Sequence, residues 1–296
     1  LGPYEVEVSC GGEAAVNAKK SSCKKNPGHI NFIPFEQFSI SDLPDRYKEA
    51  DDMYDTIKAL ASITVLINGA FISQDRPEKL SDGTLYPLFN KAGTAAVLNG
   101  TGKLTHTKVY TEEDDKACPC QDCKLAETPV KKWGTIAVFT AKHVIFDDSE
   151  AAAATFEMTY EHARETKKHI LKGVCLEDCD LDLDWCRVTC VEHDTEFVKF
   201  VDKTLICGYE NRHNDIVKKY LHSEPRGKGQ MVVIVSHPHG CDKLISVGEC
   251  VEREEVMCVF THLSTKYKYT TATCPGSSGA PVYVVKPWFS NHTHSG

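Results

Sequence analysis

The chain has 296 residues, of which 41% are hydrophobic and 26% are charged, and its formal net charge is −8. These values are ordinary for a globular protein, and the acidic balance excludes the basic footprint of most nucleic-acid-binding domains. No apolar run approaches the ~18 residues of a membrane-spanning helix. We therefore expect neither nucleic acid nor a membrane as a partner.

The amino-terminal third reads differently from the rest of the chain. Asp42 and Pro44 give a helix start signal, and apolar side chains at helical spacing predict one amphipathic helix over about 45–61. The helix is expected to pack on the following domain, with a partner-binding role as the alternative. Residues 68–90 are rich in Gly, Pro, Asp and Ser. We place a domain boundary there and interpret residues 1–90 as an amino-terminal extension.

From about residue 91, short apolar runs alternate with turn clusters, which is typical of an all-β barrel or sandwich. A helix is predicted over 211–223, and no repeat of fixed period is visible. The predicted strands are Thr94–Asn99, Lys103–Tyr110, Gly134–Thr140, Thr155–Tyr160, His169–Cys175, Asp184–Cys190, Thr204–Gly208, Met231–Ser236, Leu244–Val251, Val256–Thr261, Tyr267–Cys274 and Ala280–Val285.

A candidate nucleophile lies in the stretch Cys274-Pro275-Gly276-Ser277-Ser278-Gly279-Ala280-Pro281. Gly276 and Gly279 allow the backbone to turn tightly and to approach a substrate closely. Ser278 can then expose its hydroxyl while backbone N–H groups point into one small space that suits an oxyanion. Most Gly-x-Ser-Gly tetrapeptides are ordinary turns. The prediction therefore depends on a base and an acid elsewhere in the chain.

Both partners are present upstream. A predicted strand runs into Thr140-Ala141-Lys142-His143, which supplies a candidate base. Between His143 and Ser278, an aspartate-rich turn leads into the apolar strand that starts at Asp184. A carboxylate buried beside an imidazole would fix its tautomer and stabilise the imidazolium.

Together, Thr140-Ala-Lys-His143 and Gly276-Ser-Ser-Gly-Ala-Pro281 resemble the motifs of the chymotrypsin-like (trypsin-like) serine proteases, in the family's order His, Asp, Ser. The segment 231–248 is similar to the second barrel of the HtrA-like, non-zymogen branch. The resemblance implies a mainly β fold of two six-stranded antiparallel β-barrels, at about 91–200 and 201–296. It also implies a serine endopeptidase that needs no cofactor and acts on a protein or peptide substrate.

The resemblance assigns roles residue by residue. Ser278 would be the nucleophile, His143 the general base, and Asp184 the acid that orients it, with Asp182 as the alternative acid. The backbone N–H groups of Gly276 and Ser278 would form the oxyanion hole. Ala272 and Thr273 would lie at the floor of the substrate pocket, where an uncharged floor gives no support for a Lys or Arg preference.

Two departures from the family pattern affect these expectations. Ser277 stands where zymogen-type members have an aspartate, so activation by insertion of a new amino terminus is not expected. Few residues follow Ser278, so the second barrel is expected to be incomplete unless further segments of a longer polypeptide or a partner chain complete it. The rival function is a catalytically inactive protease fold that serves as an interaction module.

The 14 cysteines are unevenly placed, and three lie together as Cys118-Pro-Cys120-Gln-Asp-Cys123. We expect reduced cysteines in a loop and no metal. The alternatives are disulfides or a zinc site with a fourth ligand such as Cys179, Cys190 or His193. The absence of a signal-peptide pattern and of cysteines beside His143 favours a cytoplasmic location, whereas sequons at Asn99 and Asn291 leave secretion open.

Overall fold

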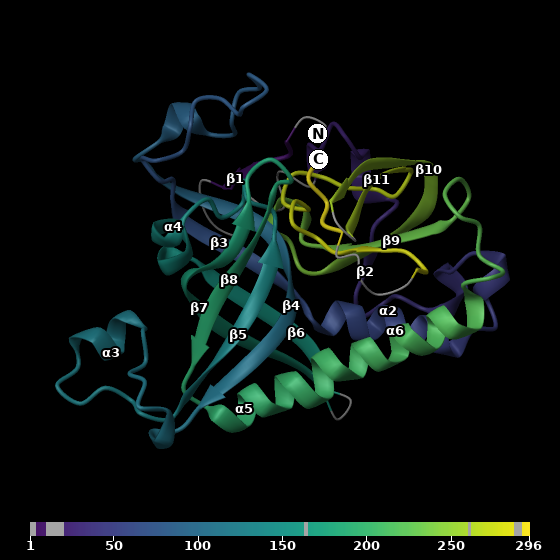
Figure 1. Ribbon diagram of the computed structural model, residues 1–296. Coiled ribbons are helices and arrows are strands. Elements are labelled where there is room, and N and C mark those ends of the chain that lie inside the picture. Colours follow the sequence, from purple (N-terminus) through teal and green to yellow (C-terminus); the bar gives the residue numbers. More distant parts are fainter. Residues whose placement is uncertain (1–3, 10–20, 163–164, 260–261, 287–291) are drawn as a thin grey trace.

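The computed structural model describes residues 4–9, 21–162, 165–259, 262–286 and 292–296. These residues form a mainly β structure with two antiparallel sheets, one closed into a ring and the other open, and a few helices pack beside them (Figure 1). The predicted fold class, mainly β with two antiparallel units, is confirmed.

The first sheet is a closed ring with one additional strand on its edge. Its strand order is β1-β4-β3-β6-β7-β8-β5, and a further pairing between β4 and β5 closes the ring. Closure pairs every ring strand on both of its sides, and β1 covers the part of β4 at residues 97–99 that β5 does not reach. The strands are β1 (Glu7–Ser9), β3 (Thr64–Phe71), β4 (Ala95–Tyr110), β5 (Trp133–Thr140), β6 (Thr155–His162), β7 (Glu165–Asp180) and β8 (Trp185–Glu192).

β4 joins two segments that the sequence predicts as separate strands. The intervening glycines do not make a turn, because Gly100 pairs with Ile67 and Gly102 pairs with Val65 on β3. A Cβ atom at Gly100 would overlap the Val144 side chain. These glycines therefore allow close packing inside the ring rather than a reversal of the chain.

The second sheet is shorter and remains open over the described residues. Its order is β11-β10-β9-β12, and β2 pairs with Leu244 and Ile245 on the side of β10 opposite to β9. All six residues of β9 are buried, so this strand forms the centre of the second unit. The strands are β2 (Ile33–Pro34), β9 (Met231–Ser236), β10 (Leu244–Val259), β11 (His262–Tyr269) and β12 (Val282–Tyr283).

The amino-terminal ninety residues contribute strands to both sheets. β1 and β3 belong to the first sheet and β2 to the second. Both sheets therefore contain strands from before and from after the predicted boundary near residue 90. The helix of this region, α2 (Asp51–Ser62), starts six residues later than predicted, because residues 45–47 form a separate 3-10 turn. Its buried Ile57 and Leu60 belong to the core cluster that includes side chains of both sheets.

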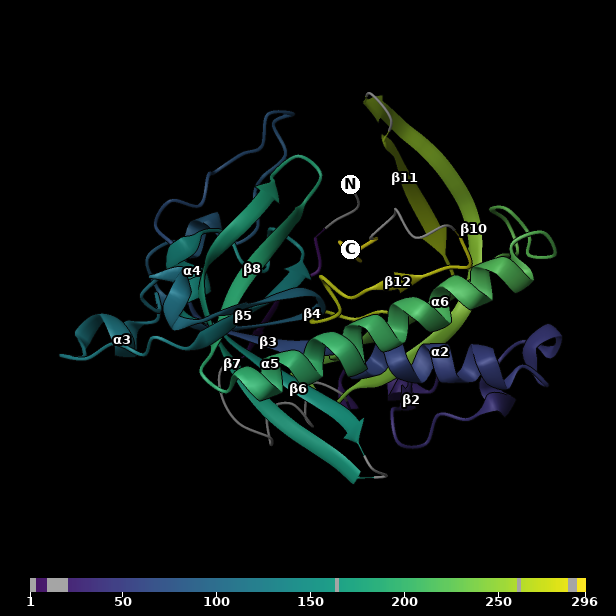
Figure 2. The same cartoon turned by 60° about the horizontal axis from the view of Figure 1, so that its bottom comes forward.

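One long helical segment lies along both sheets (Figure 2). It consists of α5 (Thr195–Phe200), a π-helix (Val201–Ile206) and α6 (Cys207–Tyr220), and α6 packs against α2. The predicted strand at 204–208 is wrong. Its buried Leu205 and Ile206 face the core from a helix, and periodicity cannot distinguish a short apolar run in a strand from one in a helix.

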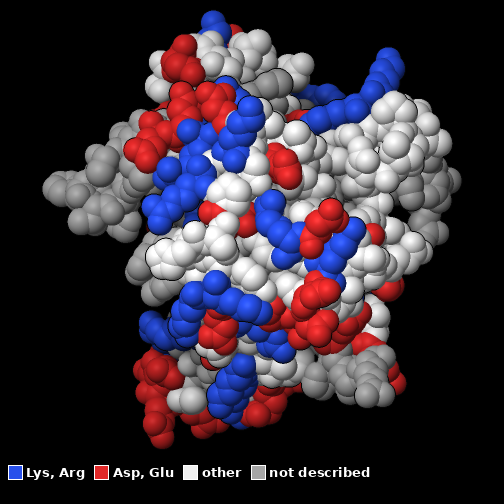
Figure 3. All heavy atoms as spheres, turned by 90° about the vertical axis from the view of Figure 1, so that its right-hand side faces the viewer, with Lys and Arg blue, Asp and Glu red and all other residues white. Residues whose placement is uncertain are grey.

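The described surface shows mixed charge. On the face drawn in Figure 3, basic and acidic side chains are interleaved rather than gathered by sign. Among the described residues, no helix has the length and apolar character needed to cross a membrane. The sequon residue Asn99 is only 8% exposed, and its side-chain amide donates to Asn68 Oδ1 at 2.7 Å, so it is poorly placed to accept a glycan. The other sequon residue, Asn291, lies outside the described residues.

Candidate active site

His143 and Asp184 are brought together by the ends of two neighbouring ring strands. His143 lies in the turn after β5, and Asp184 immediately precedes β8. His143 Nδ1 lies 2.8 Å from Asp184 Oδ2, and the backbone N–H of His143 donates to Asp184 Oδ1 at 3.0 Å. Because a carboxylate only accepts, Nδ1 must carry the proton, and Nε2 is then free to act as a base. Both side chains are almost completely buried.

Asp184, rather than its alternative Asp182, contacts the imidazole. Asp182 is exposed and accepts a hydrogen bond from Ser81 Oγ at 3.1 Å. Asp184 adopts a positive φ of 54°, which is uncommon for a residue other than glycine. This backbone conformation is strained, and strain of this kind persists only where the surrounding structure enforces it.

A buried arginine, which the sequence analysis missed, supports the turn that carries His143. Arg76 Nη1 donates to the carbonyl oxygen of His143 at 3.0 Å. Its Nε and Nη2 each donate to a carboxylate oxygen of Glu150 on α4 (Asp148–Ala153) at 2.7 Å, and both residues are buried. Bidentate pairing of this kind fixes the guanidinium in one orientation. No local motif in the sequence connects Arg76 with His143, which lies 67 residues away.

The loop that carries Ser278 is fixed against the first sheet by Thr101 of β4. The Thr101 backbone N–H donates to the carbonyl oxygen of Ser278 at 2.8 Å, and its hydroxyl donates to the carbonyl oxygen of Gly276 at 2.8 Å. Gly276 and Gly279 have φ angles of 97° and 84°, and a Cβ at Gly279 would overlap Thr101 O and Thr140 Oγ1. Glycine is therefore required at Gly279 both by conformation and by space.

The backbone amides of Gly276 and Ser278 are candidate oxyanion donors. Both residues are buried, and neither amide has a hydrogen-bond partner among the groups that the structure describes. By contrast, the Ser277 amide donates to the Cys274 carbonyl at 2.8 Å. The amides of Gly276 and Ser278, on either side of Ser277, are therefore both available to donate hydrogen bonds to an oxyanion.

A segment from the amino-terminal region covers the side chains of His143 and Ser278. Ser278 Oγ donates to the carbonyl oxygen of Glu5 at 2.6 Å, and the Tyr4 ring centroid lies 5.0 Å from that of His143. His143 Nε2 is buried without a hydrogen-bond partner among the described residues. The hydroxyl of Ser278 is therefore held by Glu5 and does not donate to His143.

Residues 292–295 approach the same site from the other end of the described chain. Ser295 Oγ donates to Asp184 Oδ2, and the Gly279 amide donates to the His294 carbonyl at 2.7 Å. Burial lowers the pKa of His294 to about 3, so this side chain is neutral. The sequence analysis gave this segment no role in the site.

The predicted substrate-pocket residues, Ala272 and Thr273, are buried beneath residues of the amino-terminal region. Ala272 packs in a cluster with Cys23 and Phe32. Asn26 Nδ2 donates to the Thr273 carbonyl at 2.8 Å, and Lys25 Nζ donates to Thr273 Oγ1 at 2.9 Å. The segments 4–9 and 23–32 therefore cover both the candidate catalytic residues and the predicted pocket floor.

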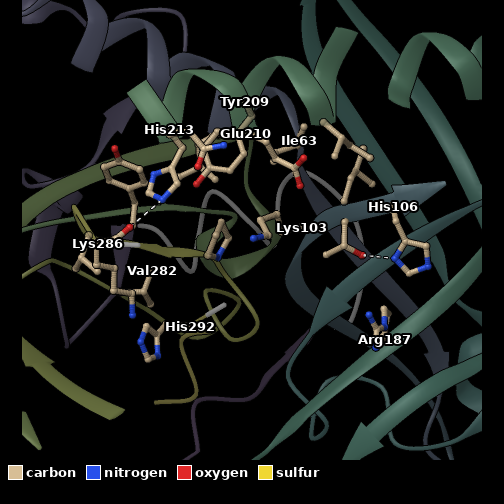
Figure 4. A pocket seen from close by; sticks show the side chains of 18 residues that line it. Ile63, Lys103, His106, Arg187, Tyr209, Glu210, His213, Val282, Lys286 and His292 are labelled. Carbon is tan, nitrogen blue, oxygen red and sulfur yellow. Dashed lines mark hydrogen bonds between the residues drawn. The ribbon is translucent and has the colours of Figure 1, made fainter. Parts of the chain in front are cut away.

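A cavity of about 490 Å³ lies apart from these residues. Its lining includes residues of β4, α6 and 281–286 together with His292, and Figure 4 shows Lys103, Glu210, His213 and Lys286 around it. Neither His143 nor Ser278 is among its lining residues. We therefore do not identify this cavity with the candidate active site.

Two clusters of cysteine and histidine lie elsewhere in the described structure. The first unites Cys118, Cys120 and Cys123 with His193, whereas the alternative fourth ligands Cys179 and Cys190 are not part of it. The second contains Cys23, His29, His239 and Cys274, four residues that are distant in sequence. The sequence analysis did not foresee the second cluster.

No protein-family model and no curated protein matches the sequence. Several solved structures match most of the chain at low sequence identity and low TM-score. "Deg5" is 10% identical with a TM-score of 0.40, and the match covers 82% of each chain. The Rv3671c protease from M. tuberculosis, active form, is 13% identical with a TM-score of 0.36, covering 79% of this chain and 70% of that one.

A third similar structure is the MamO protease domain from Magnetospirillum magneticum, apo form. It is 9% identical with a TM-score of 0.34, and the match covers 77% of this chain and 81% of that one. Similarity at this level carries no argument about fold or activity. The functional argument therefore rests on the geometry of the site.

Proposed function

We propose that the protein is a serine endopeptidase in which Ser278 is the nucleophile, His143 the base and Asp184 the acid that orients it. The observation that carries the proposal is the buried His143–Asp184 pair, whose two hydrogen bonds hold Nδ1 against the carboxylate and leave Nε2 without a partner among the described residues. Ser278 lies on a loop between Gly276 and Gly279. Hydrogen bonds from Thr101 fix this loop to the first sheet, which carries the His143–Asp184 pair. The three residue types are those of an acyl-transfer triad.

In the proposed reaction, Ser278 Oγ attacks the carbonyl carbon of the scissile peptide bond while His143 Nε2 takes the hydroxyl proton. The oxyanion accepts hydrogen bonds from the amides of Gly276 and Ser278, which have no other partner among the described groups. The C–N bond then breaks as Nε2 gives its proton to the leaving amine. A water molecule then attacks the acyl ester as it loses a proton to Nε2, and Nε2 gives that proton to Ser278 Oγ as the acyl C–O bond breaks, which releases the carboxylic acid and restores Ser278.

The covering segment makes the described state a blocked one. The Glu5 backbone carbonyl accepts a hydrogen bond from the Ser278 hydroxyl. The hydrogen bond between the nucleophile and the base therefore forms only after residues 4–6 leave. The segment is held by β1, which pairs with residues 97–99 of β4, and by an ion pair between Glu5 and Lys25. A substrate must therefore displace it or enter after a partner has removed it.

Labelling with a fluorophosphonate tests this function. We expect slow labelling of the full chain, labelling about ten times faster in a chain lacking residues 1–6, and none in either background after Ser278→Ala. The truncation removes the Glu5 contact and retains Glu7 and the pairing of β1. Labelling that persists after Ser278→Ala would overturn the assignment of the nucleophile.

The second candidate function is a protease fold without activity that serves as an interaction module. The observation that favours it is the missing Ser278–His143 hydrogen bond in the described state. This function predicts no labelling of Ser278 even after residues 1–6 are removed, although circular dichroism shows that the truncated chain is folded.

A further inference from the structure

We propose that Cys118, Cys120, Cys123 and His193 form a structural zinc site. His193 Nε2 lies 3.3 Å from Cys118 Sγ and 3.6 Å from both Cys120 Sγ and Cys123 Sγ. A tetrahedral zinc ion with its usual bond lengths separates sulfur and nitrogen ligands by about 3.6 Å. All four ligand atoms lie within 4.8 Å of one another, so one ion can contact them all.

The surroundings of the cluster suit a closed metal site rather than a reactive one. The three cysteines are buried with Trp133 and Val191 in a small apolar cluster, and only His193 is exposed. The backbone N–H of Cys123 donates to Cys120 Sγ at 3.4 Å. Amide donors of this kind stabilise a zinc-bound thiolate, and an apolar shell restricts access of water.

The site would hold a loop that has little other support. Residues 111–132 connect β4 to β5, and Figure 1 shows their helix α3 (Gln121–Leu125) standing away from the sheets. Leu125, in this helix, is 78% exposed. Outside the cluster, the loop is joined to the sheets by a hydrogen bond from Trp133 Nε1 to the Lys116 carbonyl at 3.0 Å and by an exposed ion pair of Asp122 with Lys172. A metal that joins the loop to His193, at the end of β8, supplies the missing anchor.

Zinc content of the purified full chain tests the proposal. After loading with Zn²⁺ and removal of free metal, His193→Ala and Cys120→Ser should each contain about one zinc per chain less than the unaltered protein. The matched controls are His222→Ala and Cys179→Ser, which change exposed residues outside the cluster and should leave the zinc content unchanged. Equal zinc in His193→Ala and the unaltered protein would overturn the proposal.

A second measurement uses the unaltered chain and therefore does not depend on whether the variants fold. In the unaltered, zinc-loaded chain, Cys118, Cys120 and Cys123 should resist alkylation together and react at least ten times faster when a strong chelator is added. Cys179, which is exposed, should react at the same rate with and without the chelator. Chelator-independent alkylation of the three cysteines, or a disulfide between two of them, would also overturn the proposal.

Independently, we infer that Cys23, His29, His239 and Cys274 form a second zinc site. Cys274 Sγ lies 3.4 Å from Cys23 Sγ and 3.6 Å from His29 Nε2, and the four ligand atoms lie within 4.8 Å of one another. Two thiolates and two imidazoles are a common ligand set for structural zinc. Three of these residues are buried and come from separate parts of the chain.

Neighbouring groups contact three of these ligands as they do in known zinc sites. Glu7 Oε2 lies 2.7 Å from His239 Nδ1, which directs Nε2 of the same ring towards the cluster. A carboxylate that accepts from the second nitrogen of a histidine is the usual support for a zinc ligand. Asn26 donates its backbone N–H to Cys23 Sγ at 3.4 Å and its side-chain amide to Cys274 Sγ at 3.2 Å.

The second site has its own test. His29→Ala should contain about one zinc per chain less than the unaltered protein. The double variant His29→Ala with His193→Ala should contain about two less, and the control His222→Ala should contain as much zinc as the unaltered protein. In the unaltered chain, Cys23 and Cys274 should become reactive to alkylation only when a chelator is added. A Cys23–Cys274 disulfide in the native protein, or no loss of zinc with His29→Ala, would overturn this inference.

Discussion

The closed first sheet and the open second sheet contribute differently to the candidate active site. His143 and Asp184 both belong to the ring, where neighbouring strand ends, β5 and β8, hold them in contact. Ser278 follows a strand of the open sheet and reaches the pair only through contacts between the two units. The base and its acid are therefore set by one sheet alone, whereas the position of the nucleophile depends on how the two sheets meet.

Thr101 is the residue at which they meet. Its carbonyl accepts from Thr140 Oγ1 at 2.7 Å within the ring. Its hydroxyl donates to Gly276 O and accepts from the His237 backbone N–H at 3.0 Å on the other side. Changes at this junction should displace Ser278 while leaving His143 and Asp184 in place.

Gly279→Ala, at the junction between the two sheets, should have the largest effect on stability. The added Cβ would overlap Thr101 O and Thr140 Oγ1, at a residue whose φ is 84°. We expect the free energy of unfolding to fall by about 4 kcal/mol or more, with labelling of Ser278 at least ~100-fold slower, because no flexible side-chain end can yield. Urea unfolding and fluorophosphonate labelling measure the two effects.

Gly83→Ala is the matched control. Gly83 has the same φ of 84°, but a Cβ there would meet no atom within 4 Å. The backbone conformation alone should cost about 1–2 kcal/mol. Equal losses at Gly83 and Gly279 would show that the junction with Thr101 is not the sensitive point.

Asp184→Asn should affect chemistry more than stability, because it changes the pair within the ring. An amide in place of the carboxylate no longer stabilises the imidazolium, and labelling should slow by roughly 10³–10⁴-fold. Asp182→Asn should change the labelling rate less than about two-fold, since Asp182 is exposed and bonded to Ser81. A larger effect at Asp182 would reverse the assignment of the acid.

Acid should weaken the packing of residues 292–294 against the second unit before it weakens the ring. Burial lowers the pKa of both His292 and His294 to about 3, against about 6.5 in an unfolded chain. Between these values the unfolded segment binds more protons than the folded one, so stability decreases as the pH falls from about 6.5 towards 3. Protonation also removes the acceptor that His294 Nδ1 offers to the Tyr269 hydroxyl at 2.6 Å.

Hydrogen-exchange protection factors measure this difference between the sheets. At pH 5, compared with pH 7.5, the amides of Gly279 and Val282 should lose about ten-fold in protection, because they donate to the carbonyls of His294 and His292. Protection of the β5 amides should change far less. A uniform loss over both sheets would contradict the separation of the two units.

Much of the ring and its two site residues could be predicted because local patterns determine them. A strand that ends in Thr140-Ala-Lys-His143 and one that begins at Asp184 are each legible over a few residues. Residues 99–102 misled the prediction because the glycines of β4 are required by packing against Val144 and Val138, not by a turn. The helix at 201–206 was missed because a short apolar run has no clear period.

Contacts between distant segments could not be predicted. Nothing local connects Glu5 with Ser278, which are 273 residues apart, or His29 with Cys274, which are 245 apart. The three clustered cysteines were visible as a half-site, but only the register of β8 against β5 brings His193 to them. These features arise from tertiary packing, which a single sequence does not encode in any short pattern.

The convergence of residues 4–7 and 292–295 on one site sets an order of events during synthesis. Chains emerge from the ribosome amino end first, and their early parts begin to fold before the later parts exist. The ring that carries His143 can therefore form while Ser278 and His294 are still untranslated, with residues 4–7 already present. On this order, the nucleophile would first meet its base in a nascent chain whose own early residues already lie across it.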